Sequence, residues 1–84
     1  MLDKTNLDIK QRFYEAFDKL AEIGMLQSKT AFYAEYNVDK NNFNNARHMD
    51  NRRIDVRLLG IIVEKYNVSA YWLLTGNGKM FGNK

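Results

Sequence analysis

The chain has 84 residues, 45% of them hydrophobic and 27% charged, which is enough for one small globular domain and no more. It has no cysteine and only one histidine, so disulfides, thiolate or multi-histidine metal sites and a conventional catalytic triad are excluded. The longest apolar run, Leu58 to Val63, is far shorter than the roughly 20 residues of a membrane-spanning helix. The start, MLDKTNLDIK, lacks the apolar core of a signal peptide, so we expect a cytoplasmic protein. Because cysteine is absent and histidine occurs only once, we expect no metal, and no cofactor is expected either.

The net charge of +3 is distributed unevenly along the chain. Residues 1–39 carry five basic and seven acidic residues, a net charge of −2, whereas residues 40–57 carry five basic and two acidic residues, a net charge of +3. A basic edge with an acidic part turned away from it would orient the domain on a polyanion.

Hydrophobic periodicity predicts an all-α fold with five helices and no strands. The first helix is expected to begin near Thr5, which with Asp8 resembles a capping box, and to stop at Gly24. Its apolar face comprises Ile9, Phe13, Ala16, Phe17 and Leu20. Its outer face is expected to carry Lys10, Glu15, Asp18, Lys19 and Glu22. Met25 and Leu26 are expected to pack where the chain turns.

Ser28 is the expected N-cap of a second helix, and Asn37 follows it where the chain must turn sharply. Asp39 is expected to cap a third helix that ends near Met49. The third helix contains four asparagines, which are poor helix formers, so this segment either is not helical or uses the asparagines for another purpose. The apolar side of this segment consists of Phe32, Tyr36, Val38, Phe43 and Ala46.

Asp55 is expected to cap a fourth helix, VRLLGIIVEKY, and Asn67 to end it. This helix is apolar nearly all the way round and is therefore expected to be central. Gly60 within it costs about 1 kcal/mol relative to alanine, which we attribute to the close approach of a neighbouring helix.

Ser69 is expected to cap a short fifth helix, Ala70 to Thr75, which Gly76 and Gly78 close. Its three consecutive large apolar residues cannot all face inward. We expect two of them to pack in the core and the remainder to form a homodimer contact. All three are therefore candidates for that contact: Trp72, Leu73 and Leu74. No linker, repeat or second domain is evident, so residues 1–84 are expected to form a single domain.

The segment YNVSAYWLLTGNGKM, Tyr66 to Met80, resembles the fourth-to-fifth-helix segment of phage-repressor-like helix-turn-helix proteins. This is the Cro and lambda-repressor superfamily, also called the xenobiotic-response-element type. The resemblance covers about residues 8–81 and places the helix-turn-helix at about residues 28–48. It implies a compact five-helix DNA-binding domain, usually of a transcriptional regulator and usually dimeric on DNA.

Three positions depart from the family pattern. Asn37 stands at the turn glycine, Tyr33 at a small residue and Ala46 at a branched aliphatic residue. We hypothesise that the large Tyr33 and the small Ala46 compensate and keep the core volume roughly constant. The angle between the second and third helices depends on this compensation.

The exposed face of the third helix is the candidate DNA-reading surface, because asparagine can bond adenine N6 and N7 and lysine can reach guanine O6 and N7. The base-reading candidates are Lys40, Asn41, Asn44, Asn45 and His48. The resemblance also implies phosphate contacts at the start of the second helix and after the third, and the candidates for them are Lys29, Asn42, Arg52 and Arg53. The alternatives are that these side chains are merely solvated, that Asn42 caps or packs, and that Arg47 pairs with Asp50 or Glu35.

The first interpretation is a sequence-specific regulator that binds double-stranded DNA, with two recognition helices of a homodimer about 34 Å apart. The alternative is a protein-interaction module on the same fold, resembling an antitoxin or antirepressor, which the modest charge and acidic first half keep open. An enzyme is not expected, because no catalytic constellation and no small-molecule substrate are evident.

Overall fold

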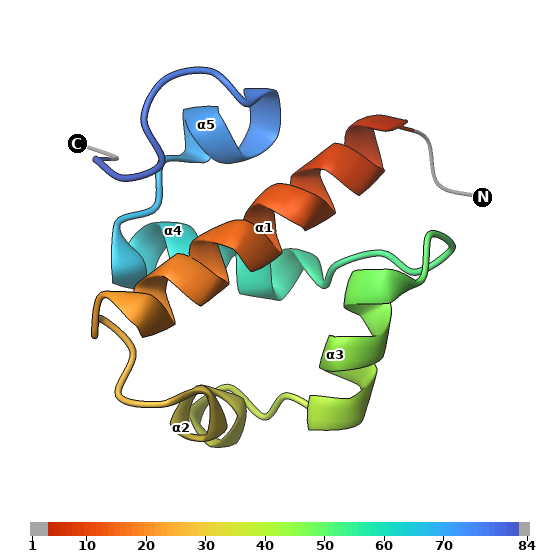
Figure 1. Ribbon diagram of the computed structural model, residues 1–84, viewed down its shortest axis with the longest axis vertical. Coiled ribbons are helices and arrows are strands. Elements are labelled where there is room, and N and C mark those ends of the chain that lie inside the picture. Colours follow the sequence, from red (N-terminus) through yellow and green to blue (C-terminus); the bar gives the residue numbers. More distant parts are fainter. Residues whose placement is uncertain (1–3, 83–84) are drawn as a thin grey trace.

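The computed structural model describes the backbone of residues 4–82 and the side chains of residues 7–82. Figure 1 shows five α-helices in this part of the chain: α1 (Lys4–Glu22), α2 (Lys29–Glu35), α3 (Lys40–His48), α4 (Val56–Tyr66) and α5 (Ala70–Thr75). Over the same residues there is no strand, only an isolated antiparallel bridge between Val68 and Phe81. The predicted compact, all-α, five-helix fold is confirmed. None of these helices has the length and apolarity that crossing a membrane requires.

The predicted helix ends follow from local capping. A side-chain oxygen accepts a backbone N–H at each of four N-caps: Ser28, Asp39, Asp55 and Ser69. Asn37 and Asn67 adopt the left-handed conformation, with φ of 54° and 60°. The first helix begins at Lys4, one residue before the predicted start, so Thr5 lies inside α1 and is not its N-cap. After α1, Leu26 is buried as predicted, whereas Met25 is exposed.

The central helix is α1 and not α4. In Figure 1, α1 crosses the middle of the molecule, and it packs against α3, α4 and α5. Its apolar face is buried at Phe13, Ala16, Phe17 and Leu20. By contrast, α4 buries only Leu58 and Ile62, and its first residue, Val56, is 76% exposed. The apolar composition of α4 therefore overstated its burial, because a helix at the edge of a small domain has neighbours on one side only.

Gly60 does not mark a close approach of helices. A Cβ built on Gly60 would have no neighbouring atom within 4 Å, and the residue is exposed. The predicted reason for this glycine is therefore wrong, and nothing in the structure explains it.

An aromatic cluster joins the first three helices. The ring of Phe17 on α1 lies 5.0 Å from that of Phe32 on α2 and 5.0 Å from that of Phe43 on α3. Tyr33 is buried among them, 5.3 Å from Phe43 and 6.2 Å from Phe17. The large residue at a position where the family pattern has a small one thus packs against rings from both α1 and α3. Such edge and offset contacts are the favoured geometries of aromatic pairs.

Candidate functional site

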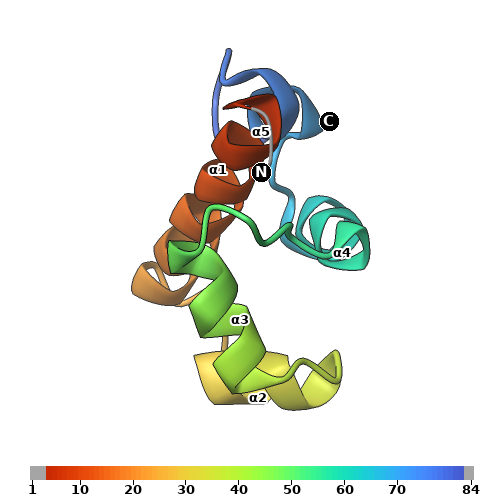
Figure 2. The same cartoon turned by 90° about the vertical axis from the view of Figure 1, so that its right-hand side faces the viewer.

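The outward face of α3 brings together all five residues predicted to read bases. Phe43 and Ala46 are buried and attach α3 to the core. All the remaining polar residues of α3 except the half-buried Arg47 are exposed: Lys40, Asn41, Asn42, Asn44, Asn45 and His48. At 100° per residue, Asn41, Asn45 and His48 lie on the side opposite Phe43, and Asn44 lies about 100° from Phe43 around the helix axis. In Figure 2, α3 stands in front and no other segment crosses it.

The turn between α2 and α3 determines how α3 projects. The Tyr36 N–H donates to the Phe32 carbonyl over 3.1 Å, and the Val38 N–H donates to the Tyr33 carbonyl over 2.8 Å. The left-handed Asn37 reverses the chain between these bonds, and Asp39 then accepts the Asn42 N–H over 2.9 Å. In Figure 1, α2 is seen nearly end-on while α3 is seen lengthwise, so the two helices run in clearly different directions.

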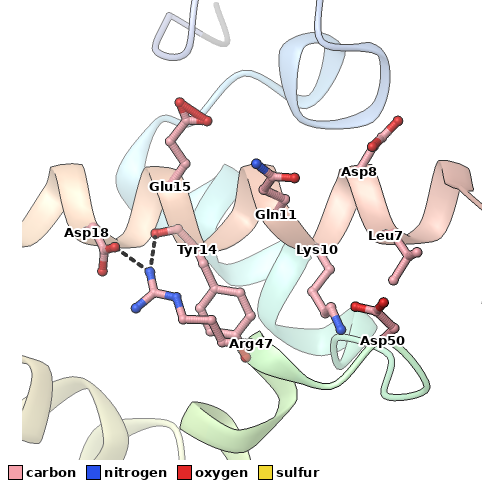
Figure 3. Close-up of a pocket in the computed structure, with 9 residues that line it drawn as sticks. All are labelled: Leu7, Asp8, Lys10, Gln11, Tyr14, Glu15, Asp18, Arg47 and Asp50. Atoms are coloured by element: carbon pink, nitrogen blue, oxygen red, sulfur yellow. Dashed lines mark hydrogen bonds and ion pairs between the residues drawn. The ribbon is translucent and has the colours of Figure 1, made fainter.

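A single carboxylate connects α2 and α3 to α1. Asp18 accepts from the Lys29 Nζ over 3.1 Å. It also accepts from the Arg47 guanidinium, which in turn donates to the Tyr14 carbonyl over 3.3 Å, and Figure 3 shows both of these contacts. The prediction that Arg47 pairs with Asp50 or Glu35 was wrong, because the aromatic cluster places α3 beside α1. Lys29, predicted to contact phosphate, is held in this ion pair in the free protein.

Tyr14 is a second connection between α1 and α3. Its buried hydroxyl donates to the Phe43 carbonyl over 2.5 Å, and the Arg47 guanidinium lies 4.8 Å from the centre of its ring. Burial raises the pKa of Tyr14 to about 12, and Tyr33 adds to this rise whereas the positive charge of Arg47 opposes it. The neutral phenol is therefore the form that the fold favours.

The predicted position of Lys10 was wrong. It was expected on the outer face of α1, but it is only 4% exposed. Its Nζ donates to the Met49 carbonyl over 2.7 Å and to the Arg52 carbonyl over 2.8 Å. The signal was present, because Lys10, Phe13, Tyr14 and Phe17 follow the i, i+3, i+4, i+7 spacing of one helix face. An apolar stripe that contains one lysine indicates a buried amine that needs partners.

The predicted phosphate-contact residues fall into two groups. Asn42, Arg52 and Arg53 are exposed and line a hollow of about 270 Å³ between α3 and the start of α4. Over residues 7–82, neither of the two arginine guanidiniums makes an ion pair or a hydrogen bond. Lys29 lies apart from them, beside Asp18. Of the cations predicted to contact phosphate, the two without a partner among residues 7–82 therefore both lie just after α3.

A larger hollow, of about 650 Å³, lies between α1 and the end of α3. Figure 3 shows Tyr14 and Lys10 pointing from α1 toward α3 and the loop after it. Four carboxylates also line the hollow: Asp8, Glu15, Asp18 and Asp50. Within the part of the chain that the structure describes, no three carboxylate or histidine side chains are grouped so that they could hold a metal ion.

Two of the three consecutive apolar residues of α5 face the core and the third faces solvent, as expected for neighbouring residues on a helix. Trp72 and Leu73 are buried, Leu73 to 1% exposure, whereas Leu74 is 52% exposed beside the exposed Tyr71. The expectation that two of the three pack in the core is confirmed for Trp72 and Leu73, which are therefore no longer candidates for the dimer contact. Leu74 is the candidate that remains.

No protein-family model matches the chain, and no curated protein and no solved structure is significantly similar to it.

Proposed function

We propose that the protein is a sequence-specific double-stranded DNA-binding regulator of the helix-turn-helix type, related to the Cro and lambda-repressor superfamily. The observation that carries the proposal is the outward face of α3, where amide and basic side chains form one uncovered surface on a helix that Phe43 and Ala46 attach to the core. The nine residues of α3 span about 13 Å, and a B-DNA major groove admits a helix of this kind.

The two groups of side chains would contribute differently to binding. Asn41 and Asn44 lie in the first turns of α3, from which a recognition helix reaches base edges, and their amides suit adenine N6 and N7. Arg52 and Arg53, whose guanidiniums are unpaired over residues 7–82, suit phosphate oxygens. Sequence preference thus comes from α3, and most of the affinity comes from neutralised phosphates.

The experiment is a selection of bound duplexes from a random pool, followed by fluorescence anisotropy on a selected and a scrambled duplex at several salt concentrations. We expect a consensus sequence and an affinity that falls linearly with salt on a logarithmic plot. Arg52→Ala should weaken binding to both duplexes and reduce the salt slope by about one. A protein that binds no duplex at low salt would refute the proposed function.

A protein-interaction module is the second candidate, and one observation favours it. Asp18 neutralises Lys29 of α2 and Arg47 of α3, which lowers the positive charge available for binding a polyanion. If the domain bound no DNA and instead formed a stable stoichiometric complex with a protein partner, the second candidate would replace the first.

A further inference from the structure

The only buried charged side chain among residues 7–82 is that of Lys10, and it lies behind the loop that carries Arg52 and Arg53. We propose that Lys10 is a positioning residue for DNA binding, which holds this loop so that the two arginines face the phosphate backbone. The inference rests on the proposed function and adds to it a residue that itself touches no DNA.

Lys10 binds both ends of the turn formed by residues 49–52, and we call this arrangement the clamp. The Arg52 N–H donates to the Met49 carbonyl over 3.0 Å, which closes a four-residue turn with Asp50 and Asn51 at its tip. The Lys10 Nζ donates to the carbonyls of the first and last residues of this same turn, over 2.7 Å and 2.8 Å. One ammonium on the central helix thus fixes both ends of the turn, and with them the direction in which the chain leaves α3.

A stabilising role alone would not require a charge at this place. Burying an ammonium is costly unless its donors are satisfied, and an apolar side chain of similar length would avoid that cost. What the ammonium adds is direction, because its hydrogen bonds hold two particular carbonyls. Its positive charge also lies at the C-terminal end of α3, where the helix dipole favours a cation.

The first arm of the test needs no DNA. Lys10→Met removes the charge and the donors while keeping the length, and Lys19→Met is the control because Lys19 is an exposed lysine of the same helix. Amide exchange measured by NMR should accelerate at Arg52 by about tenfold or more in Lys10→Met, because the turn loses its clamp. Exchange at Phe43, inside α3, should remain slow, and Lys19→Met should change neither amide. Unchanged exchange at Arg52 would overturn the clamp.

The second arm measures duplex binding. Each phosphate contact contributes about eightfold to affinity at 0.1 M salt and about 0.9 to the salt slope. Lys10→Met should therefore weaken selected and scrambled duplexes alike, by about eightfold for each arginine that no longer reaches its phosphate. Lys10→Arg keeps the charge and should retain most of the binding. If Lys10→Met does not fold, Lys10→Gln, which removes the charge and is too short to reach both carbonyls, replaces it in both arms with the same expected outcomes.

A double-mutant cycle separates positioning from general support. In a protein that already carries Arg52→Ala and Arg53→Ala, Lys10→Met should cause no further loss of affinity. A further loss as large as in the wild-type background would overturn the proposal. So would duplex binding that Lys10→Met leaves unchanged. If the wild-type protein itself binds no duplex, the proposed function fails and the DNA role of Lys10 with it, while the exchange arm still decides whether the clamp exists.

Discussion

Tyr14→Phe tests the buried hydrogen bond by which Tyr14 of α1 contacts α3. The mutation removes one hydroxyl, whose hydrogen bond to the Phe43 carbonyl is 2.5 Å long, and it leaves the ring in place. At neutral pH we expect a loss of about 1 kcal/mol in the free energy of unfolding, the usual net value of one buried hydrogen bond.

The pH dependence of this loss follows from the raised pKa. The pKa of Tyr14 is about 12 in the folded protein against 10.0 for an unperturbed tyrosine, so its contribution is complete below pH 10 and is lost as the pH rises toward 12. Between these values the unfolded chain releases a proton that the folded chain keeps, which lowers stability. At pH 11 the decrease is about 1.4 kcal/mol, since one pKa unit corresponds to about 1.36 kcal/mol.

The assay is urea unfolding followed by circular dichroism from pH 7 to pH 11. The stability advantage of the wild-type protein over Tyr14→Phe, about 1 kcal/mol at pH 7, should fall by about 1.4 kcal/mol over this range, so that Tyr14→Phe becomes slightly the more stable at pH 11. Tyr71→Phe is the matched control, because Tyr71 is exposed and its difference from the wild type should stay nearly constant. Other groups that titrate at high pH cancel in both differences. An advantage of Tyr14 that did not change with pH would refute the burial of its neutral phenol.

Five further variants have expected outcomes. Gly60→Ala should raise the free energy of unfolding by about 1 kcal/mol, because a Cβ at this position meets no atom within 4 Å. Gly76→Ala should lower the free energy of unfolding, because the φ of +81° strains any residue with a Cβ. Calorimetry measures both changes. Asn44→Ala should cost about 1–3 kcal/mol on the selected duplex and little on a scrambled one, and equal losses would contradict base reading. Asp18→Asn should release its two cations and steepen the salt slope by up to about 1.8 in anisotropy titrations. Leu74→Asp should convert a dimer into a monomer in sedimentation, and an unchanged mass would exclude Leu74 from the contact.

The parts of the fold that could be predicted are those fixed by neighbours in the chain. Ser28 and Asp39 cap the helices they precede, and Asn37 takes the left-handed turn, because each depends on a few adjacent residues. The polar outward face of α3 was also predictable, since Phe43 and Ala46 define its buried side at helical spacing.

The parts that could not be predicted depend on which segments meet in space. Asp18 was assigned to a solvated face, yet it binds Lys29 and Arg47 because the aromatic cluster brings α2 and α3 beside α1. Lys10 was assigned to the outer face of α1 because it is charged, although it lies on the same helix face as Phe13, which indicated burial. A residue type gives the cost of burial, but only the packing shows which partners offset it.

The most direct measurement of the central claim is an NMR titration of the isotopically labelled protein with the selected duplex. We expect the largest shift changes on the backbone and side-chain amides of the outward face of α3 and on the amides of Arg52 and Arg53. Little change is expected on α4 and α5. Shift changes concentrated on α4 and α5, or none at low salt, would contradict the claim.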